Sequence, residues 1–370
     1  MLRSLSQYLV CPQDSAESLQ FFAFPTSASF PDNEGIIRNG VLFCPTCGAI
    51  YPIIQGIPRL IAPDLAKVDY WREKLFFEKN LIAFETNPVL KEAMQRRLAE
   101  QEISATKQEL TNVETQWWND FYDKEIKNID YIKRLPGFPE LAAGNRFFEY
   151  DEWFAKYLRP QIKGRRILEV GCGKSAFVYL RLNPEIFGYS YVGTDLSFNA
   201  LLLASQYVPG QFIQCSAEAI PFKTSSFDIL LCLGVVHHLV NWQKGLEEFF
   251  RVLESEGIVC FQEAVTKKRF FARWRTKSFT ADKDSPNEAD IPEDEFKFRL
   301  QKYAKVQKWM RHYSTVRFVF EYLMKLGTLM DQSRLLTQMV IIIDKIVLST
   351  LGRILPEFEG GEILAILRKI

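Results

Sequence analysis

Short apolar runs in the second half of this 370-residue chain predict buried strands. The runs ILEV (167–170), YSYVGTD (189–195), SFDILLC (226–232) and GIVCFQEA (257–264) are rich in β-branched and apolar residues, and polar or turn-forming residues bound them. Residues 64–162 instead carry charged and apolar residues at helical spacing, without strand-like alternation. The pattern therefore predicts a long helical region followed by a sheet.

The pattern changes again after residue 264. Residues 296–326 and 332–355 are predicted as amphipathic helices, and GEILAILRK (361–369) as a final strand. The sequence does not place the strand that would precede it in a sheet. The basic segment 267–275 could bind an anionic substrate or a membrane surface, although a solvated helix face is the more ordinary interpretation.

A glycine turn follows the first predicted strand, with Glu169 before Gly171 and Gly173. A second strand ends on Asp195, where a carboxylate can accept hydrogen bonds from both hydroxyls of a ribose. A P-loop is excluded, because Leu168 stands where that loop needs its first glycine. The dinucleotide fingerprint is matched in spacing, but Glu169 would place a carboxylate close to a pyrophosphate. A cationic ligand suits this turn better.

The chain carries, in this order, the segments ILEVGCG, VGTDLS, SAEAIPF, SFDILLC and RVLESEG. Their order and spacing resemble those of the class I S-adenosylmethionine-dependent methyltransferases, type 11 in particular. The resemblance covers about residues 150–265. It implies that the glycine turn passes under the methionine moiety, that the second-strand acid holds the ribose, and that the start of SAEAIPF flanks the adenine. The implied cofactor-binding residues are Glu169, Gly171, Gly173, Asp195, Leu196, Ser216, Ala217 and Glu218.

The chain departs from the family pattern at two positions. Ser175 replaces a third glycine and is a reasonable helix N-cap. Ser216 replaces an aspartate that often faces the adenine amino group, and a hydroxyl accepts less strongly than a carboxylate. His238 stands where the family often has a histidine, which makes it a candidate general base. The alternative is that His237 or His238 only hydrogen-bonds the following loop.

The N-terminal segment carries a second motif. Cys44 and Cys47 form a CxxCG knuckle, and its partner has Cys11 with Asp14 where a four-cysteine ribbon would have cysteine. The phrase YPIIQGIPRLI resembles the small zinc-ribbon proteins that activate transfer-RNA methyltransferases. The predicted ligands of a structural Zn²⁺ are therefore Cys11, Asp14, Cys44 and Cys47, although some such modules fold without metal.

Composition narrows the function classes. The formal net charge is +1 and basic residues are interspersed with acidic ones, so nucleic acid is not the expected partner. No signal peptide or transmembrane segment is predicted, since the apolar stretch 335–343 is too short to span a bilayer. Peripheral membrane contact stays open. Seven cysteines, an odd number, suit a reducing cytoplasm, and the oligomeric state is not indicated.

Together these features predict an α/β fold: a doubly wound class I methyltransferase sheet with a helical cap and a small N-terminal zinc-ribbon-like module. The predicted function is methylation of a small or lipid-like molecule, with oxygen favoured as the accepting atom. The alternatives are an RNA or protein methyltransferase that uses the ribbon for recognition, and a noncatalytic partner. Segments 63–162 and 265–355 should roof the acceptor site. The expected units are 1–62 (ribbon), 63–162 (helical cap), 163–264 (cofactor-binding core), 265–360 (helical insertion or substrate cap) and 361–370 (last strand).

Overall fold

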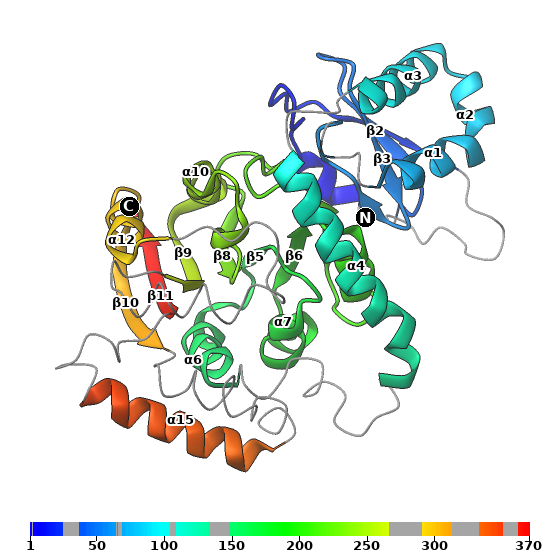
Figure 1. The fold of residues 1–370 in the computed structure, drawn as a ribbon. Helices are drawn as coiled ribbons and strands as arrows, with labels where there is room; N and C mark the ends of the chain where they lie inside the picture. The colour runs from blue at the N-terminus through cyan, green and yellow to red at the C-terminus, as the bar shows by residue number, and fades with distance from the viewer. Residues whose placement is uncertain are drawn as a thin grey trace.

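A computed structural model gives the fold of the chain (Figure 1). It describes residues 1, 3–24, 37–63, 65, 69–103, 109–132, 148–265, 291–312, 333–350 and 362–370. The basic segment 267–275 lies outside these residues.

A seven-stranded sheet forms the centre of the molecule. Its order is β10-β11-β9-β8-β5-β6-β7. The five strands from β7 to β9 are mutually parallel, whereas β11 pairs antiparallel with both β9 and β10. The predicted strands and the doubly wound architecture are confirmed. The strands are β5 (Arg166–Val170), β6 (Ser190–Asp195), β7 (Gln211–Gln214), β8 (Phe227–Leu233), β9 (Leu253–Ala264), β10 (Ala304–His312) and β11 (Glu362–Lys369).

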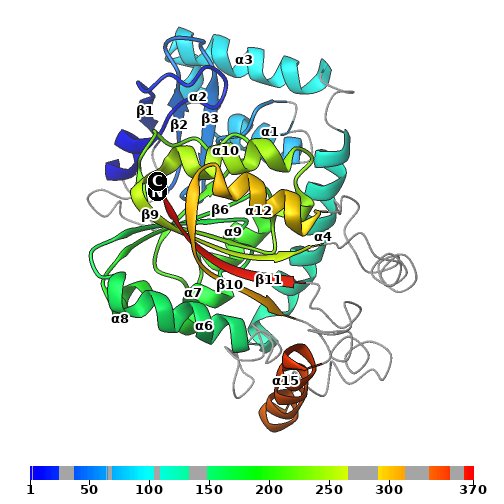
Figure 2. The ribbon, with the colours of Figure 1, turned by 90° about the vertical axis from the view of Figure 1, so that its left-hand side faces the viewer.

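Helices cover both faces of this sheet, and Figure 2 shows α10 and α6 on opposite sides of the strands. The alternation along β5 sends Ile167 into the core on one face, and Leu168 and Val170 into the core on the other. The first face is covered by α6 (Phe148–Leu158), α7 (Ala176–Arg181) and α9 (Phe198–Ala204), and the second by α10 (Trp242–Val252) and α12 (Glu293–Gln301). The short elements η4 (Arg159–Gln161), α8 (Pro184–Phe187) and η5 (Val236–His238) lie in the connections.

The N-terminal module shares the second face. Its elements are η1 (Arg3–Tyr8), β1 (Gln20–Ala23), β2 (Gly40–Phe43), β3 (Ile50–Ile54) and β4 (Ile57–Pro58), and the strands form one antiparallel sheet. Residues 215–226, which join β7 to β8, contain no helix. The module packs over this connection: Val10 N donates to Pro221 O at 3.0 Å, and Lys223 N donates to Tyr8 O at 2.9 Å. It therefore covers a part of the sheet that a crossover helix would otherwise cover.

The described part of the region between the module and the sheet consists of helices and short connections, as predicted. It contains α1 (Tyr70–Lys79), α2 (Leu81–Glu85), α3 (Pro88–Ile103) and α4 (Glu109–Ile132) before α6. The helix α15 (Arg334–Ser349) agrees with the helix predicted over 332–355, and both views place it at the opposite end of the molecule from the module. Among the described helices, none has the length and apolarity needed to cross a bilayer.

The helix predicted over 296–326 is wrong in its middle. Of its described residues, those up to Gln301 are helical, as part of Glu293–Gln301, and Ala304–His312 forms β10, the strand that the sequence did not place. Residues 313–326 lie outside the described part of the chain. The final strand β11 pairs antiparallel with β9 and β10, so the predicted final strand is confirmed. The segment 265–360, expected to be a helical insertion, therefore also supplies an edge strand of the central sheet.

A buried ion-pair network joins the module to the helical region and to the sheet. Arg59, which follows β4, donates from Nε to Glu73 Oε1 at 2.9 Å, and Arg97 donates to both oxygens of that carboxylate at 2.6 and 2.8 Å. Arg59 also pairs with Asp69 at 3.4 Å, and Asp69 accepts from the side-chain amide of Gln214 at 3.4 Å. Arg59 and Glu73 are fully buried, so each charge depends on its partners.

Candidate functional site

A cavity of about 360 Å³ opens at the carboxyl ends of the parallel strands. It lies where the strand order reverses between β5 and β8, the position at which open α/β sheets bind their ligands. The strand ends supply most of the wall, and the rest comes from α4, α7 and η5. The lining residues are Glu114, Trp118, Tyr122, Glu169–Lys174, Phe177, Thr194–Leu196, Cys215, Ala217, Leu233–Val235, His238, Leu239 and Gln262.

The glycine turn forms the floor of this cavity. Gly171 and Gly173 have φ angles of +62° and +51°, in the left-handed region that favours glycine. A Cβ at Gly171 would lie 2.4 Å from Val235 Cγ2, and one at Gly173 would lie 2.5 Å from the Tyr122 hydroxyl. Both positions therefore require glycine for backbone conformation and for space.

Ser175 stands at the N-cap position of α7 but makes no capping hydrogen bond with its side chain. Its φ of 52° places it in the left-handed region, and its hydroxyl lies 2.8 Å from the hydroxyl of Tyr191. Ser175 therefore occupies the predicted N-cap position, but its side chain turns toward Tyr191 and does not cap the helix.

Glu169 brings a buried carboxylate to the edge of the turn. The hydroxyl of Tyr191 donates to its Oε2, and Thr194 Oγ1 donates to its backbone carbonyl at 3.2 Å. The side chain is almost fully buried, yet it lines the cavity. A buried anion at this point favours a cationic ligand and disfavours a pyrophosphate.

Asp195 ends β6 beside Glu169. Gly173 N donates to its Oδ2 at 2.9 Å and Ser197 N donates to its Oδ1 at 2.8 Å. A carboxylate has about four lone-pair sites, so each oxygen can still accept one hydroxyl of a ribose. Burial raises the pKa of Asp195 to about 6 against these two amide hydrogen bonds.

The remaining predicted cofactor residues divide into two groups. Leu196 and Ala217 line the cavity, and Gln214 Nε2 donates to the Leu196 carbonyl at 2.8 Å. Ser216 and Glu218 are not among the lining residues. Instead Ser216 Oγ accepts from Glu218 N at 3.1 Å, and Glu218 Oε1 accepts from Asn241 N at 2.9 Å. These two side chains shape the loop around Ala217.

One face of α4 closes the cavity. Glu114, Trp118 and Tyr122 recur every four residues and all line it. The helix is held to the start of α9, because Ser197 Oγ donates to Asn119 Oδ1 at 2.7 Å and Asn199 Nδ2 donates to the Asn119 carbonyl at 3.0 Å. None of these three residues was among the predicted site residues, although their i, i+4, i+8 spacing places Glu114 on the same helix face as Trp118 and Tyr122.

The two histidines of η5 point to different partners. His237 Nδ1 contacts the buried carboxylate of Glu263, whose other oxygen accepts from Val236 N at 2.7 Å. His238 lines the cavity, and its Nδ1 lies 3.0 Å from Glu114 Oε1. His237 therefore holds the turn, whereas His238 is placed at the candidate acceptor site.

Of the two segments that were expected to cover the acceptor site, only the first contributes described residues to the cavity. The helical region contributes α4, but within residues 291–312 and 333–350 no side chain lines the cavity. The prediction that both flanking segments roof the site is thus wrong for these described parts of the second segment. Residues 266–290 and 313–332 lie outside the described chain.

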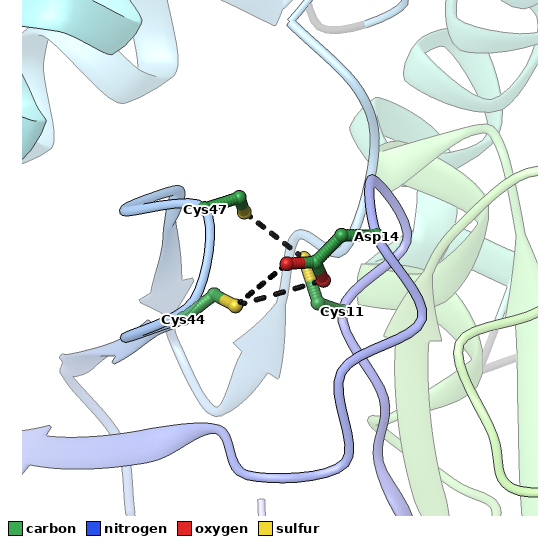
Figure 3. A group of neighbouring side chains, drawn as sticks. All are labelled: Cys11, Asp14, Cys44 and Cys47. Atoms are coloured by element: carbon green, nitrogen blue, oxygen red, sulfur yellow. Dashed lines mark hydrogen bonds between the residues drawn. The ribbon is translucent and has the colours of Figure 1, made fainter.

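The four predicted metal ligands of the N-terminal module come together, and Figure 3 shows them around one point. Their ligand atoms all lie within 4.8 Å of one another. Cys11 Sγ is 3.6 Å from Cys47 Sγ, and Cys44 Sγ is 3.5 Å from Asp14 Oδ2. A tetrahedron with Zn–S about 2.3 Å and Zn–O about 2.1 Å has ligand separations of about 3.8 and 3.6 Å. The residues therefore fit Zn²⁺, which would supply cross-linking rather than chemistry.

Proton release should accompany metal binding at this cluster. Burial raises the pKa of Cys11 to about 12, and a thiolate is the form that binds zinc. The hydroxyl of Tyr51 lies 3.2 Å from Cys11 Sγ and can donate to the bound thiolate.

We expect one Zn²⁺ per chain by elemental analysis, and we expect Cys47→Ser to lower the melting temperature by roughly 5 °C or more. Calorimetry on the surviving folded variant should find nearly unchanged cofactor affinity. Cys260→Ala, which removes a buried thiol of β9, should keep its zinc. A metal-free wild type of normal stability would show that apolar contacts alone hold the module.

Comparison with known proteins places residues 168–261 in the family described as "Methyltransferase domain". An uncharacterised protein of Methanocaldococcus jannaschii is 31% identical over 158 residues, which cover 41% of this chain and 64% of that protein. A phthiotriol/phenolphthiotriol dimycocerosates methyltransferase of Mycobacterium ulcerans is 30% identical over 109 residues, covering 28% of this chain and 39% of that one. The matched regions thus span less than two thirds of these relatives.

Among solved structures, a putative methyltransferase from Bacillus halodurans has a TM-score of 0.44 and 16% identity. The alignment covers 59% of this chain and 98% of that chain.

Proposed function

Since residues 168–261 belong to the class I S-adenosylmethionine-dependent methyltransferases, we propose that the chain methylates a small or lipid-like molecule, at oxygen. The observation that carries this proposal is one cavity whose lining combines the glycine turn and two carboxylates with aromatic side chains. One of these aromatic residues, Tyr122, reaches the turn at Gly173. Such a cavity suits a cationic methyl donor beside a largely apolar acceptor.

The cofactor residues have distinct proposed roles. Gly171 and Gly173 let the backbone approach the methionine moiety, Glu169 offsets its positive charge, and Asp195 accepts from the ribose hydroxyls. Ala217 would flank the adenine. When bound, S-adenosylmethionine supplies an electrophilic methyl group. The roles of Ser216 and Glu218 become indirect, because their side chains shape the loop and do not line the cavity.

The acceptor side is formed by Trp118, Tyr122 and Phe177. Their rings favour an apolar or aromatic acceptor, whose orientation beside the methyl donor can contribute about 7–11 kcal/mol to lowering the barrier. The relatives named for phthiotriol and phenolphthiotriol dimycocerosates support a lipid-like acceptor. Peripheral contact with a membrane agrees with such a substrate. A cytoplasmic location remains a prediction, supported by the seven free cysteines.

Transfer of an isotope-labelled methyl group tests the acceptor class. The full chain is incubated with labelled S-adenosylmethionine and with a lipid extract, total RNA or a protein fraction. We expect base-stable label, as an ether methyl, in the organic phase only. Label in RNA or protein would overturn the proposed acceptor, and absence of label from every fraction would support the noncatalytic alternative. Asp195→Ala is the control for enzyme-dependent transfer.

A further inference from the structure

Glu114 is a buried carboxylate that reaches the cavity from α4, outside the cofactor residues. Its side chain is 6% exposed. Trp118 Nε1 donates to its Oε1 at 2.8 Å, and His238 Nδ1 lies 3.0 Å from the same oxygen. The Trp118 ring meets the His238 ring edge to face at a centroid distance of 5.4 Å. One helix thus supplies both the carboxylate and the ring that hold the histidine.

This arrangement determines which ring nitrogen of His238 carries the proton when the imidazole is neutral. An ionised carboxylate only accepts hydrogen bonds, so the imidazole nitrogen that faces it must carry the proton. In neutral imidazole the other nitrogen, Nε2, is then the acceptor. Trp118 Nε1 can only donate, which orients the same carboxylate oxygen and leaves its accepting character unchanged.

We propose that Glu114 is a positioning residue that fixes His238 with its proton on Nδ1, so that Nε2 takes the proton of a protic acceptor. The inference rests on the proposed function and requires that the reacting oxygen of the acceptor carry a proton, as a hydroxyl does. The acceptor lone pair forms the new bond to the methyl carbon while the carbon–sulfur bond breaks. The sulfonium becomes a neutral thioether, and the acceptor proton passes to Nε2.

The surroundings of His238 also suit the charged imidazolium that this step produces. The imidazolium that forms keeps its Nδ1 proton directed at Glu114, which stabilises the positive charge. Near His238 also lie the ring of His237, with a centroid distance of 4.0 Å, and the carboxylate of Asp195, which interacts with it electrostatically. The carboxylate of Glu263 contacts His237 and not His238.

Nitrogen-15 NMR of the full chain measures the tautomer directly, because the chain has only three histidines. With the imidazole neutral, we expect mostly the Nδ1–H form of His238 in the wild type. In Glu114→Ala the Nε2–H form should become the majority. Trp118→Phe removes the indole N–H that donates to Glu114 and should retain the wild-type tautomer.

A wild-type His238 that is mainly protonated on Nε2 would overturn the proposal, and this result needs no variant. An unchanged tautomer in folded Glu114→Ala would overturn it equally. The same wild-type sample is titrated with S-adenosylhomocysteine. Failure to bind it would contradict the proposed function, whereas a failed tautomer prediction with intact binding would contradict only the role of Glu114.

Discussion

Replacing Glu73 by alanine is expected to destabilise the protein by about 3–5 kcal/mol, because removal of one partner leaves buried charges unpaired. Two buried guanidiniums, those of Arg59 and Arg97, share this carboxylate. Glu78 lies exposed on the same helix, so Glu78→Ala controls for the loss of a glutamate from α1. Denaturant unfolding measures both variants. A change below about 1 kcal/mol for Glu73→Ala, the size expected of surface pairs, would contradict the importance of the network.

The same residue predicts a pH dependence. Burial opposes ionisation of Glu73, but Arg97 and Arg59 outweigh it and lower its pKa from 4.5 to about 2. A lowered carboxyl pKa contributes stability that is complete above about pH 4.5 and is lost as the pH falls toward 2. We therefore expect the free energy of unfolding to fall less steeply across this window in Glu73→Ala than in the wild type. Parallel slopes would contradict the assigned pKa shift.

Asp195→Ala should weaken binding of S-adenosylhomocysteine by a hundredfold or more. Two hydrogen bonds from ribose hydroxyls to a carboxylate are each worth about 1.5–3 kcal/mol, and 1.4 kcal/mol corresponds to tenfold in affinity. Titration calorimetry of the folded variant measures the loss. Glu247→Ala, which removes an exposed glutamate from α10, should bind as the wild type does. Unchanged affinity in folded Asp195→Ala would remove this residue from the cofactor site.

Cofactor affinity should also depend on pH through Asp195. Burial raises its pKa to about 6, and the ionised form is the stronger acceptor for ribose hydroxyls. Binding therefore favours loss of the proton, and wild-type affinity should fall as the pH is lowered through about 6. Asp195→Asn cannot titrate and should lack this component of the dependence.

The parts of the site built from local backbone could be predicted from the sequence. Gly171, Gly173 and Asp195 belong to short strand-and-turn segments, and the structure brings them together at one end of the sheet. The sequence also paired Cys11 with the Cys44 knuckle across more than thirty residues, because metal-ligand spacing is a strong signal.

The strand β10 could not be predicted, because it breaks the two-residue period that identifies strands. The register of its pairing with β11 shifts between Val306 and Lys308. The apolar residues Val306 and Trp309 on either side of this shift are three positions apart in the sequence. That spacing resembles a helical face. The irregularity is tolerated at the edge of the sheet, where only β11 pairs with it.

Glu114 could not be predicted as a site residue for a different reason. Helical spacing shows that it shares a face with Trp118 and Tyr122, but only tertiary packing shows that this face covers the cavity. The rotation of α4 about its own axis is set by hydrogen bonds between Asn119 and the residues Ser197 and Asn199, which lie far from Asn119 in the sequence. Tertiary packing also decides the role of the Ser175 side chain: the residue stands at the predicted N-cap position, but its hydroxyl contacts Tyr191 of β6 and not the helix.

Native mass spectrometry of the purified full chain tests the central claim most directly. With S-adenosylmethionine added, the account predicts one bound molecule per chain and no comparable binding of NAD, because Glu169 places a carboxylate beside the glycine turn where a pyrophosphate would lie. Tight binding of NAD without binding of S-adenosylmethionine would contradict the account.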